Sequence, residues 1–326
     1  MASSLAAATR LGFRRFAHQA QSTSPRHFLS IADLTPTEFA TLVRNAASHK
    51  QQIKSGVVPR GLQGALSGKT VAMMFNKRST RTRVSTEAAA FQMGGHPMFL
   101  GKDDIQLGVN ESVYDTSVVI SSMVSCIVAR VSKHSDVKEL AEHSTVPVIN
   151  ALCDSYHPLQ TVADFLTIYE SFAPKATAHG SPSLRPRRSQ DRMATPKGYE
   201  IPADMLRVIQ GAGQGKLTQT NVPQEAVKDA DILVTDTWVS MGQEDESIKR
   251  LKAFNGFQIT SELGKGAKEN WKFMHCLPRH PEEVSDEVFY SPRSLVFPEA
   301  ENRLWAAISA LEGFVVNKAI FAKPNT

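Results

Sequence analysis

The chain has 326 residues, 41% of which are hydrophobic, and a formal net charge of +5. This length suits two ordinary α/β domains with sizeable cores. The modest charge, without a basic stripe interleaved with aromatic residues, argues against a nucleic-acid-binding protein. Three widely spaced cysteines predict no disulfide framework, and the lack of an apolar run near the roughly 18 residues of a spanning helix predicts a soluble protein.

The N-terminal segment differs in composition from the rest of the chain. No Asp or Glu precedes Asp33, and several arginines are interleaved with Leu, Phe and Ser. An acid-poor, amphipathic segment rich in Arg and Ser is typical of a mitochondrial transit peptide. The alternative is a disordered basic tail. We expect residues 1–27 to be a transit peptide that lies outside the fold.

The most informative segment lies between a predicted strand and a predicted helix. Residues 70–75 form an apolar run that predicts a buried strand, and residues 84–93 are compatible with a helix. Between them lie Ser79, Thr80, Arg81 and Thr82, followed by Arg83. Backbone N–H groups and the dipole at a helix N-terminus attract anions, and Arg81 and Arg83 add full positive charge. The segment therefore predicts a phosphate site, with a solvated basic turn as the alternative.

The flanking elements alternate between helix and strand. A helix capped by Thr35 or Thr37 is expected within 27–51. Further strands are expected at 98–100, 126–131 and 147–152, and further helices at 115–124, 136–143 and 158–172. This alternation indicates parallel βαβ units, in which ligands lie beyond the carboxyl ends of the strands. The rule places residues 79–82, Arg130 and His157 at one crevice.

A second set of α/β elements follows. Strands are predicted at 230–235 and 271–274, and each is followed by a polar loop, at 236–242 and 275–279. A closing helix is predicted with Arg303 in its first turn. The economical organisation is a first domain over 28–157 and a second over 158–326, with a C-terminal helix, 299–316, that packs back across the domains.

Together these motifs resemble the ornithine carbamoyltransferases of fungal mitochondria. The matching segments, in the family's order, are 79–82 (Ser-Thr-Arg-Thr), 107–112, 157–160 (His-Pro-Leu-Gln), 236–242, 275–279 (His-Cys-Leu-Pro-Arg) and 297–303. The Ser240-Met241-Gly242 loop distinguishes the ornithine branch from the aspartate enzymes. The resemblance implies an α/β fold of two domains, each a parallel sheet flanked by helices.

The resemblance also implies an activity. Carbamoyl phosphate and L-ornithine would give L-citrulline and phosphate, a step of arginine biosynthesis and the urea cycle, in the mitochondrial matrix and without a cofactor or metal. The implied catalytic residues are Arg130, His157, Asp236 and Cys276. The implied carbamoyl phosphate ligands are Ser79, Thr80, Arg81, Thr82, Gln106, Arg130, His157, Gln160, Cys276, Leu277 and Arg303. Asp236, Ser240 and Met241 would bind ornithine.

Assembly follows from the same resemblance. Gln106 matches a position that reaches a neighbouring subunit's site, which implies a homotrimer with shared sites and no nucleic-acid or membrane partner. Several of these residues also have plain structural interpretations. Cys276 resembles a buried structural cysteine, and His157 a capping or core histidine. Asp236 could cap a turn, and Arg303 could pair with Glu299.

The segment 173–193 departs from the family. It contains three prolines, five Lys or Arg, and Leu184 as its one large aliphatic residue, so it is unsuited to a buried parallel strand. In the family this interval holds a strand, an Asn-containing turn that binds the ornithine carboxylate region, and a helix. We therefore expect a disordered replacement, a second domain without one strand and one helix, and impaired ornithine turnover.

Two other functions compete with the implied one. A carbamoyltransferase for another amine, such as putrescine or an acetylated ornithine, is disfavoured by Ser240-Met241-Gly242. A non-catalytic or mis-spliced paralogue that binds only carbamoyl phosphate would keep the phosphate cradle and lose turnover.

Overall fold

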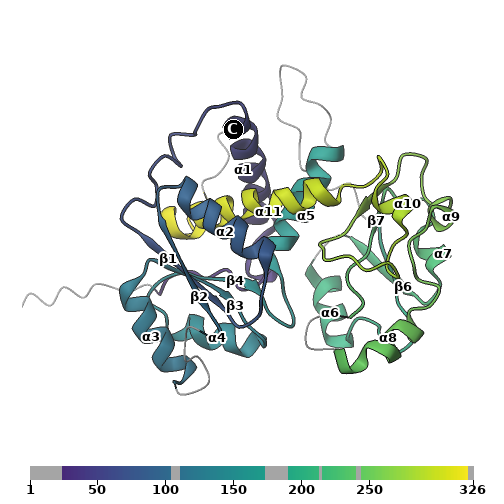
Figure 1. The fold of residues 1–326 in the computed structure, drawn as a ribbon, viewed down its shortest axis with the longest axis horizontal. Helices are drawn as coiled ribbons and strands as arrows, with labels where there is room; N and C mark the ends of the chain where they lie inside the picture. The colour runs from purple at the N-terminus through teal and green to yellow at the C-terminus, as the bar shows by residue number, and fades with distance from the viewer. Residues whose placement is uncertain (1–23, 104–110, 173–189, 213–214, 240–243, 322–326) are drawn as a thin grey trace, which may run out of the picture.

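The computed structural model describes residues 24–103, 111–172, 190–212, 215–239 and 244–321. These residues form two α/β domains, with the first half of the chain in one and most of the second half in the other (Figure 1). Within the described ranges, no helix combines the length and apolar composition needed to cross a bilayer.

The first domain contains one parallel sheet in the order β2-β1-β3-β4. Its strands are β1 (Thr70–Phe75), β2 (His96–Gly101), β3 (Cys126–Arg130) and β4 (Val148–Leu152). Its helices are α1 (Pro36–Lys54), α2 (Thr80–Gln92), α3 (Val113–Met123), α4 (His134–His143) and α5 (Pro158–Phe172). The expected alternation of strand and helix is therefore confirmed.

Both faces of this sheet are covered, as parallel sheets require. Side chains alternate along β1: Met73 belongs to the core beneath α1, α2, α5 and α11, whereas Met74 belongs to a second core with α4. Helix α11 (Val296–Leu311) lies beside α5 and α2 although it comes from the far end of the chain (Figure 1). A π-helical turn, Glu312–Val316, extends it.

Local capping chemistry sets where the helices begin. Thr35 caps α1, with its hydroxyl accepting from the Glu38 N–H while the Glu38 side chain binds back to the Thr35 N–H. Ser79 caps α2 by accepting from the Thr82 N–H. Helix α2 therefore begins at Thr80, four residues before the predicted start, because the hydroxyl-rich loop supplies the cap itself.

The second domain holds two separate two-stranded parallel sheets, β5-β6 and β7-β8. The strands are β5 (Gln190–Ala194), β6 (Lys216–Thr220), β7 (Ile232–Val234) and β8 (Lys272–Met274). The helices are α6 (Ala203–Ala212), α7 (Pro223–Ala226), α8 (Ser247–Ala253), α9 (Ser261–Gly264) and α10 (Asp286–Phe289), with short 3-10 turns at Ile31–Asp33 in the first domain and Glu244–Glu246 here. No strand among the described residues joins the two sheets.

One part of the prediction for 173–193 is wrong. Residues 190–193 belong to β5 and pair in register with β6, so they are not a disordered replacement. Backbone pairing suffices here, because residues 190–193 are exposed and need no apolar side chains. Residues 173–189 lie outside the described residues. The expected loss of one strand and one helix from the second domain stays a prediction.

The closing helix also begins earlier than predicted. Helix α11 starts at Val296, so Arg303 lies in its third turn and not its first. Pro298 falls within the first turn, where its missing N–H is tolerated. The earlier start places Glu299 and Arg303 one turn apart on the same helix.

Candidate active site

The candidate site lies where the carboxyl ends of several strands meet. Helix α2 follows β1, Arg130 ends β3, and His157 precedes α5. In the second domain, Asp236 and Cys276 each follow a strand by two residues, and those strands pair through Val234 and Met274. Parallel pairing therefore brings the two loops together at one edge.

The first turn of α2 faces the second domain through Arg81. Its guanidinium Nη2 donates to the Leu277 carbonyl oxygen at 2.5 Å. Leu277 has a φ of +62°, a conformation that non-glycine residues rarely adopt. Burial lowers the pKa of Arg81, with the Cys276 charge acting in the opposite direction.

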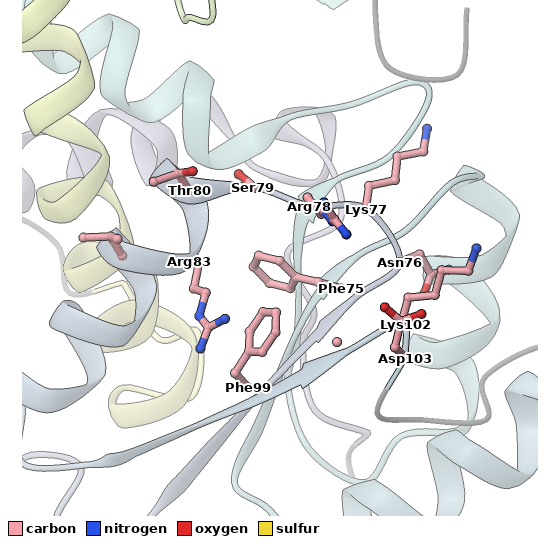
Figure 2. Close-up of a pocket in the computed structure, with 12 residues that line it drawn as sticks. Phe75, Asn76, Lys77, Arg78, Ser79, Thr80, Arg83, Phe99, Lys102 and Asp103 are labelled. Carbon is pink, nitrogen blue, oxygen red and sulfur yellow. The ribbon is translucent and has the colours of Figure 1, made fainter.

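Arg83 lies on a different side of α2 from Arg81, although it shares a cavity with Ser79 and Thr80 of the predicted phosphate site. Arg83 is exposed, its Nε donates to Glu87 Oε1 at 2.9 Å, and its guanidinium lies 3.7 Å from the centre of the Phe99 ring. It lines a cavity of about 690 Å³ together with Phe99 and Lys102, which Arg81 does not line (Figure 2). Two residues apart on a helix, Arg81 and Arg83 point to different sides.

Three arginines, Arg81, Arg130 and Arg303, lie close together beside the 79–82 loop. Arg130 and Arg303 are buried, and burial lowers the pKa of each to about 10, with neighbouring guanidinium groups acting in the same direction. Nε of Arg130 and Nε of Arg303 have no hydrogen-bond partner among the described residues. Buried guanidinium groups that disfavour one another's charge create a strongly positive pocket, which suits a doubly charged anion.

The tautomer of His157 follows from its neighbour. Arg303 Nη1 lies 3.3 Å from His157 Nε2, and because arginine only donates, Nε2 accepts. Burial first, then the charges of Arg303, Arg130 and Arg81, lower the pKa of His157 well below its usual value. The ring is therefore neutral and carries its proton on Nδ1, which has no partner among the described residues. This N–H can donate to a carbonyl oxygen.

Both the oxygen and the nitrogen of the Gln160 side-chain amide are hydrogen-bonded to protein groups. Its Oε1 accepts from Arg303 Nη1 at 2.5 Å, and its Nε2 donates to Asp164 Oδ1 at 2.7 Å and Glu299 Oε1 at 3.1 Å. Arg303 Nη2 also donates to Thr82 Oγ1 at 3.0 Å. The predicted pairing of Arg303 with Glu299 does not occur, because Gln160 stands between them.

Two carboxyl groups lie in this region: Asp164, which the sequence analysis did not name, and the buried Glu299, which it considered only as a partner of Arg303. Burial raises the pKa of both Asp164 and Glu299, and their mutual repulsion raises that of Glu299 further. Glu299 Oε2 accepts from the His275 N–H at 2.9 Å, which ties α11 to the loop after β8. The sequence signal for each was an acidic residue at an apolar helical position. Asp164 lies four residues after Gln160, and Glu299 lies four residues before Arg303.

Asp236 and Cys276 form a direct pair. The Cys276 thiol donates to Asp236 Oδ1 at 2.8 Å, and the same oxygen accepts from the Thr237 N–H at 2.7 Å. Asp236 therefore caps its turn and also contacts the thiol. Burial, followed by the charge and hydrogen bond of Asp236, raises the pKa of the Cys276 thiol well above its usual value. A protonated thiol donor is a poor nucleophile.

The remaining predicted residues divide into two groups. Ser79 and Thr80 lie at the start of α2, and Leu277 turns its carbonyl toward Arg81. Gln106, Ser240 and Met241 lie outside the described residues. The described residues hold no cluster of three or more His, Cys, Asp or Glu suited to a metal ion.

Comparison with known proteins agrees with this arrangement. Residues 26–170 match the model of the aspartate/ornithine carbamoyltransferase carbamoyl-P binding domain, and residues 189–314 match that of the Asp/Orn binding domain. The mitochondrial ornithine carbamoyltransferase of Aspergillus terreus is 71% identical over 328 residues, which cover 92% of this chain and 91% of that protein. The Schizosaccharomyces pombe protein of that name is 51% identical over 318 residues, covering 92% and 97%.

Solved structures give the same result. The crystal structure of a mitochondrial ornithine carbamoyltransferase from Coccidioides immitis is similar with a TM-score of 0.83 and 65% identity, covering 92% of this chain and all of that one. The Pyrococcus furiosus ornithine carbamoyltransferase has a TM-score of 0.79 and 40% identity, with coverage of 90% and 98%. On these grounds the chain belongs to the aspartate/ornithine carbamoyltransferase family and carries both of its substrate-binding domains.

Proposed function

We propose that this protein is an ornithine carbamoyltransferase, which converts carbamoyl phosphate and L-ornithine to L-citrulline and phosphate. The observation that carries the proposal is the cationic pocket of Arg81, Arg130 and Arg303 around a neutral His157 whose Nδ1–H has no partner among the described residues. Such a pocket suits an acyl phosphate, with charge for the phosphate and a neutral donor for the carbonyl. The relatives from Aspergillus terreus and Schizosaccharomyces pombe, both named ornithine carbamoyltransferase, support the choice of amine.

The phosphate would be held by the start of α2. Ser79, Thr80, Arg81 and Thr82 supply hydroxyl, backbone and guanidinium donors, and the helix dipole adds to their attraction for the anion. Arg303 would contact the same group, since it already donates to Thr82. Leu277 O now accepts from Arg81, so its carbonyl would lie beside the bound molecule.

The carbamoyl group would be polarised by Arg130 and by the Nδ1–H of His157. Donors aimed at the oxygen that becomes negative contribute on the order of 3–4 kcal/mol each to lowering the barrier. Gln160 would act by holding Arg303, because both ends of its amide are occupied by protein groups.

Asp236 and Cys276 would receive the δ-amine of ornithine, which must be neutral to attack the carbamoyl carbon. The C–N bond forms as the C–O bond to phosphate breaks, and the departing phosphate takes the proton released by the amine. Ser240 and Met241 would bind the α-amino and carboxylate end of the substrate.

We further propose that the enzyme is a homotrimer of the mitochondrial matrix and serves arginine biosynthesis, with Gln106 reaching a neighbouring site. The N-terminal leader would end before Arg26 rather than at residue 27. Arg26 pairs with Glu38, and His27 Nδ1 accepts from the Val148 N–H at 3.0 Å, so both residues contact the first domain.

A citrulline assay tests the proposal. The purified protein should form citrulline from carbamoyl phosphate and ornithine, and faster than the carbamoylated product from putrescine or acetylornithine. Arg81→Met should reduce the rate on the order of 100- to 1,000-fold. Arg60→Met, at an exposed arginine of the same domain, serves as the matched control and should retain the wild-type rate. Carbamoyl phosphate binding without any turnover would instead favour the non-catalytic paralogue.

A further inference from the structure

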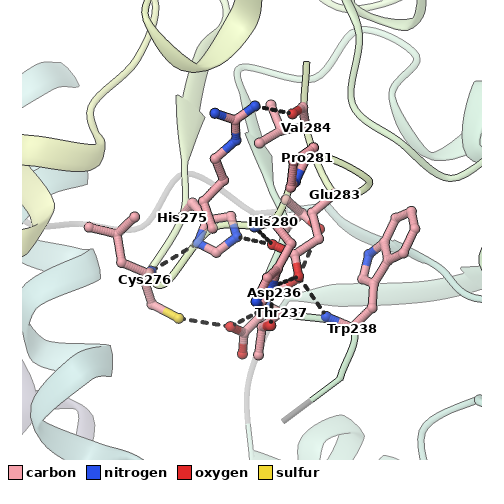
Figure 3. A network of polar contacts seen from close by, with 12 residues as sticks. Asp236, Thr237, Trp238, His275, Cys276, His280, Pro281, Glu283 and Val284 are labelled. Atoms are coloured by element: carbon pink, nitrogen blue, oxygen red, sulfur yellow. Dashed lines mark hydrogen bonds and ion pairs between the residues drawn. The ribbon is translucent and has the colours of Figure 1, made fainter. Parts of the chain in front are cut away.

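A buried carboxylate that the mechanism does not use lies behind the Asp236–Cys276 pair. Glu283 is fully buried, and each of its oxygens accepts twice (Figure 3). Oε1 accepts from the Trp238 N–H at 3.0 Å and from His280 Nδ1 at 2.8 Å. Oε2 accepts from His275 Nε2 at 3.0 Å and from the His280 N–H at 2.8 Å. All four acceptor positions of the carboxylate are therefore occupied.

The donors to Glu283 come from two different loops. Trp238 lies in the loop after β7, two residues beyond Asp236, whereas His275 and His280 lie in the loop after β8 that contains Cys276. Besides Glu283, the described contacts across this seam include the thiol of Cys276 with Asp236 at 2.8 Å and Thr237 Oγ1 with His280 Nδ1 at 3.1 Å. Glu283, which itself follows β8, therefore binds His275 and His280 of its own loop and reaches the loop after β7 through the Trp238 N–H.

The protonation of this network is determined by its donors. His275 Nδ1 accepts from the Leu277 N–H at 2.9 Å, so Nε2 carries the proton and donates to Glu283. Burial alone would raise the pKa of Glu283, but the hydrogen bonds from His275 and His280 outweigh it and lower the pKa to about 2. The carboxylate is charged at every pH at which the enzyme would work.

We propose that Glu283 is a positioning residue for carbamoyl transfer: its carboxylate clamps the loop after β7 to the loop after β8 and holds Asp236 against the Cys276 thiol. The inference rests on the proposed function for the role of that pair. It goes beyond that function because Glu283 touches no substrate group and lies behind the reacting atoms.

Glu283→Gln tests the clamp with little change of shape. The amide replaces one oxygen with an NH₂ group, which would face the Trp238 N–H or the His275 and His280 N–H groups and cannot accept from them, so at least one contact is lost. We expect kcat/KM for ornithine to fall on the order of 100-fold, since small displacements of reacting groups have effects of this size. KM for carbamoyl phosphate should stay within about twofold, because its ligands lie mainly in the first domain.

A second measurement needs no substrate. Cys276 is partly exposed and the other two cysteines are buried, so iodoacetamide labelling read by mass spectrometry reports on Cys276. In the wild type the contact with Asp236 suppresses the thiolate and labelling is slow. In Glu283→Gln the pair separates, and labelling of Cys276 should become faster.

Two further variants guard against a merely structural effect. His280→Ala removes one donor at a side chain that is 44% exposed, so folding is retained and a smaller shift of the same kind is expected. Glu312→Gln is the matched control: Glu312, in the π-helical turn after α11, accepts from His49 of α1 at 2.8 Å, away from the site. It should lower the melting temperature and leave the ornithine KM and Cys276 labelling unchanged.

The outcomes separate the two proposals. Labelling and ornithine kinetics that stay at wild-type values in Glu283→Gln and His280→Ala overturn the clamp. An equal change in the kinetics of both substrates, matched by Glu312→Gln, also overturns it. A wild-type protein that makes no citrulline overturns the proposed function, whereas Cys276 labelling still decides the role of Glu283.

Discussion

Strand β3 of the first domain and strand β5 of the second differ in environment. All five residues of β3 are buried, and it pairs with β1 on one side and β4 on the other. Four of the five residues of β5 are exposed, and among the described strands it pairs only with β6. The first-domain side of the candidate site, where we propose that phosphate binds, therefore rests on a sheet covered on both faces, whereas the second-domain side rests on short separate sheets.

This difference explains where side-chain networks concentrate. In the first domain, β1 and β3 hold the site loops by backbone pairing that is shielded from water. In the second, β7 and β8 pair over three residues only. Beyond the ends of β7 and β8, the hydrogen bonds of Glu283 link the loops that follow these strands. Polar side chains there fix the positions of the loops, which a wider sheet would otherwise do.

Hydrogen exchange should give the largest contrast between the two regions. Amides of β3 should exchange on the order of 10³- to 10⁸-fold more slowly than in an unfolded chain, because they open only with global unfolding. Amides of β5 should show little protection, since the strand is exposed and paired on one side. Equal protection of the β3 and β5 amides, measured by mass spectrometry, would contradict the proposed difference between the two strands.

Phenylalanine truncation compares the two cores. Phe273→Ala in the second domain and Phe28→Ala in the first each remove a fully buried ring and should reduce the free energy of unfolding by about 3–5 kcal/mol. Because Phe273 lies in β8, its loss should also raise the ornithine KM, whereas Phe28→Ala should not. Urea unfolding measures the loss of stability in both variants, and citrulline kinetics measure the ornithine KM. An equal ornithine KM in the two variants would contradict the prediction.

The smallest effect concerns the buried carboxyl pair between the domains. Burial and Asp164 raise the pKa of Glu299, so its proton stabilises the folded state at low pH and this stabilisation is lost as pH rises through the raised pKa. Between pH 7 and 9 the wild type should lose on the order of 1–2 kcal/mol. Glu299→Gln mimics the protonated form and should lose less, as thermal unfolding at both pH values would reveal.

Much of the first domain could be predicted because local signals and burial agree there. The run 70–75 is apolar and becomes β1, and Thr35 with Glu38 forms the expected capping box. The second domain was harder, because β5 has no apolar pattern and four of its five residues are exposed. A pattern-based argument cannot detect a strand whose side chains are exposed.

Within the site, residue types predicted the chemistry better than the directions of side chains. The gathering of Arg81, Arg130 and His157 follows from strand ends in a parallel sheet. The outward direction of Arg83 depends on its contacts with Phe99 and Glu87, which sequence spacing does not supply. The contacts of Glu299 with Gln160 and of Glu283 with Trp238 were not predicted for the same reason, since these partners are distant in the chain.

Helix α11 couples the unfolding of the two domains. Glu299 accepts from the His275 N–H of the second domain, and one turn later Arg303 donates to Thr82 of the first. This one helix therefore contacts both domains, so the unfolding of either domain disrupts contacts of the other. Calorimetry should record one heat-absorption peak, not two.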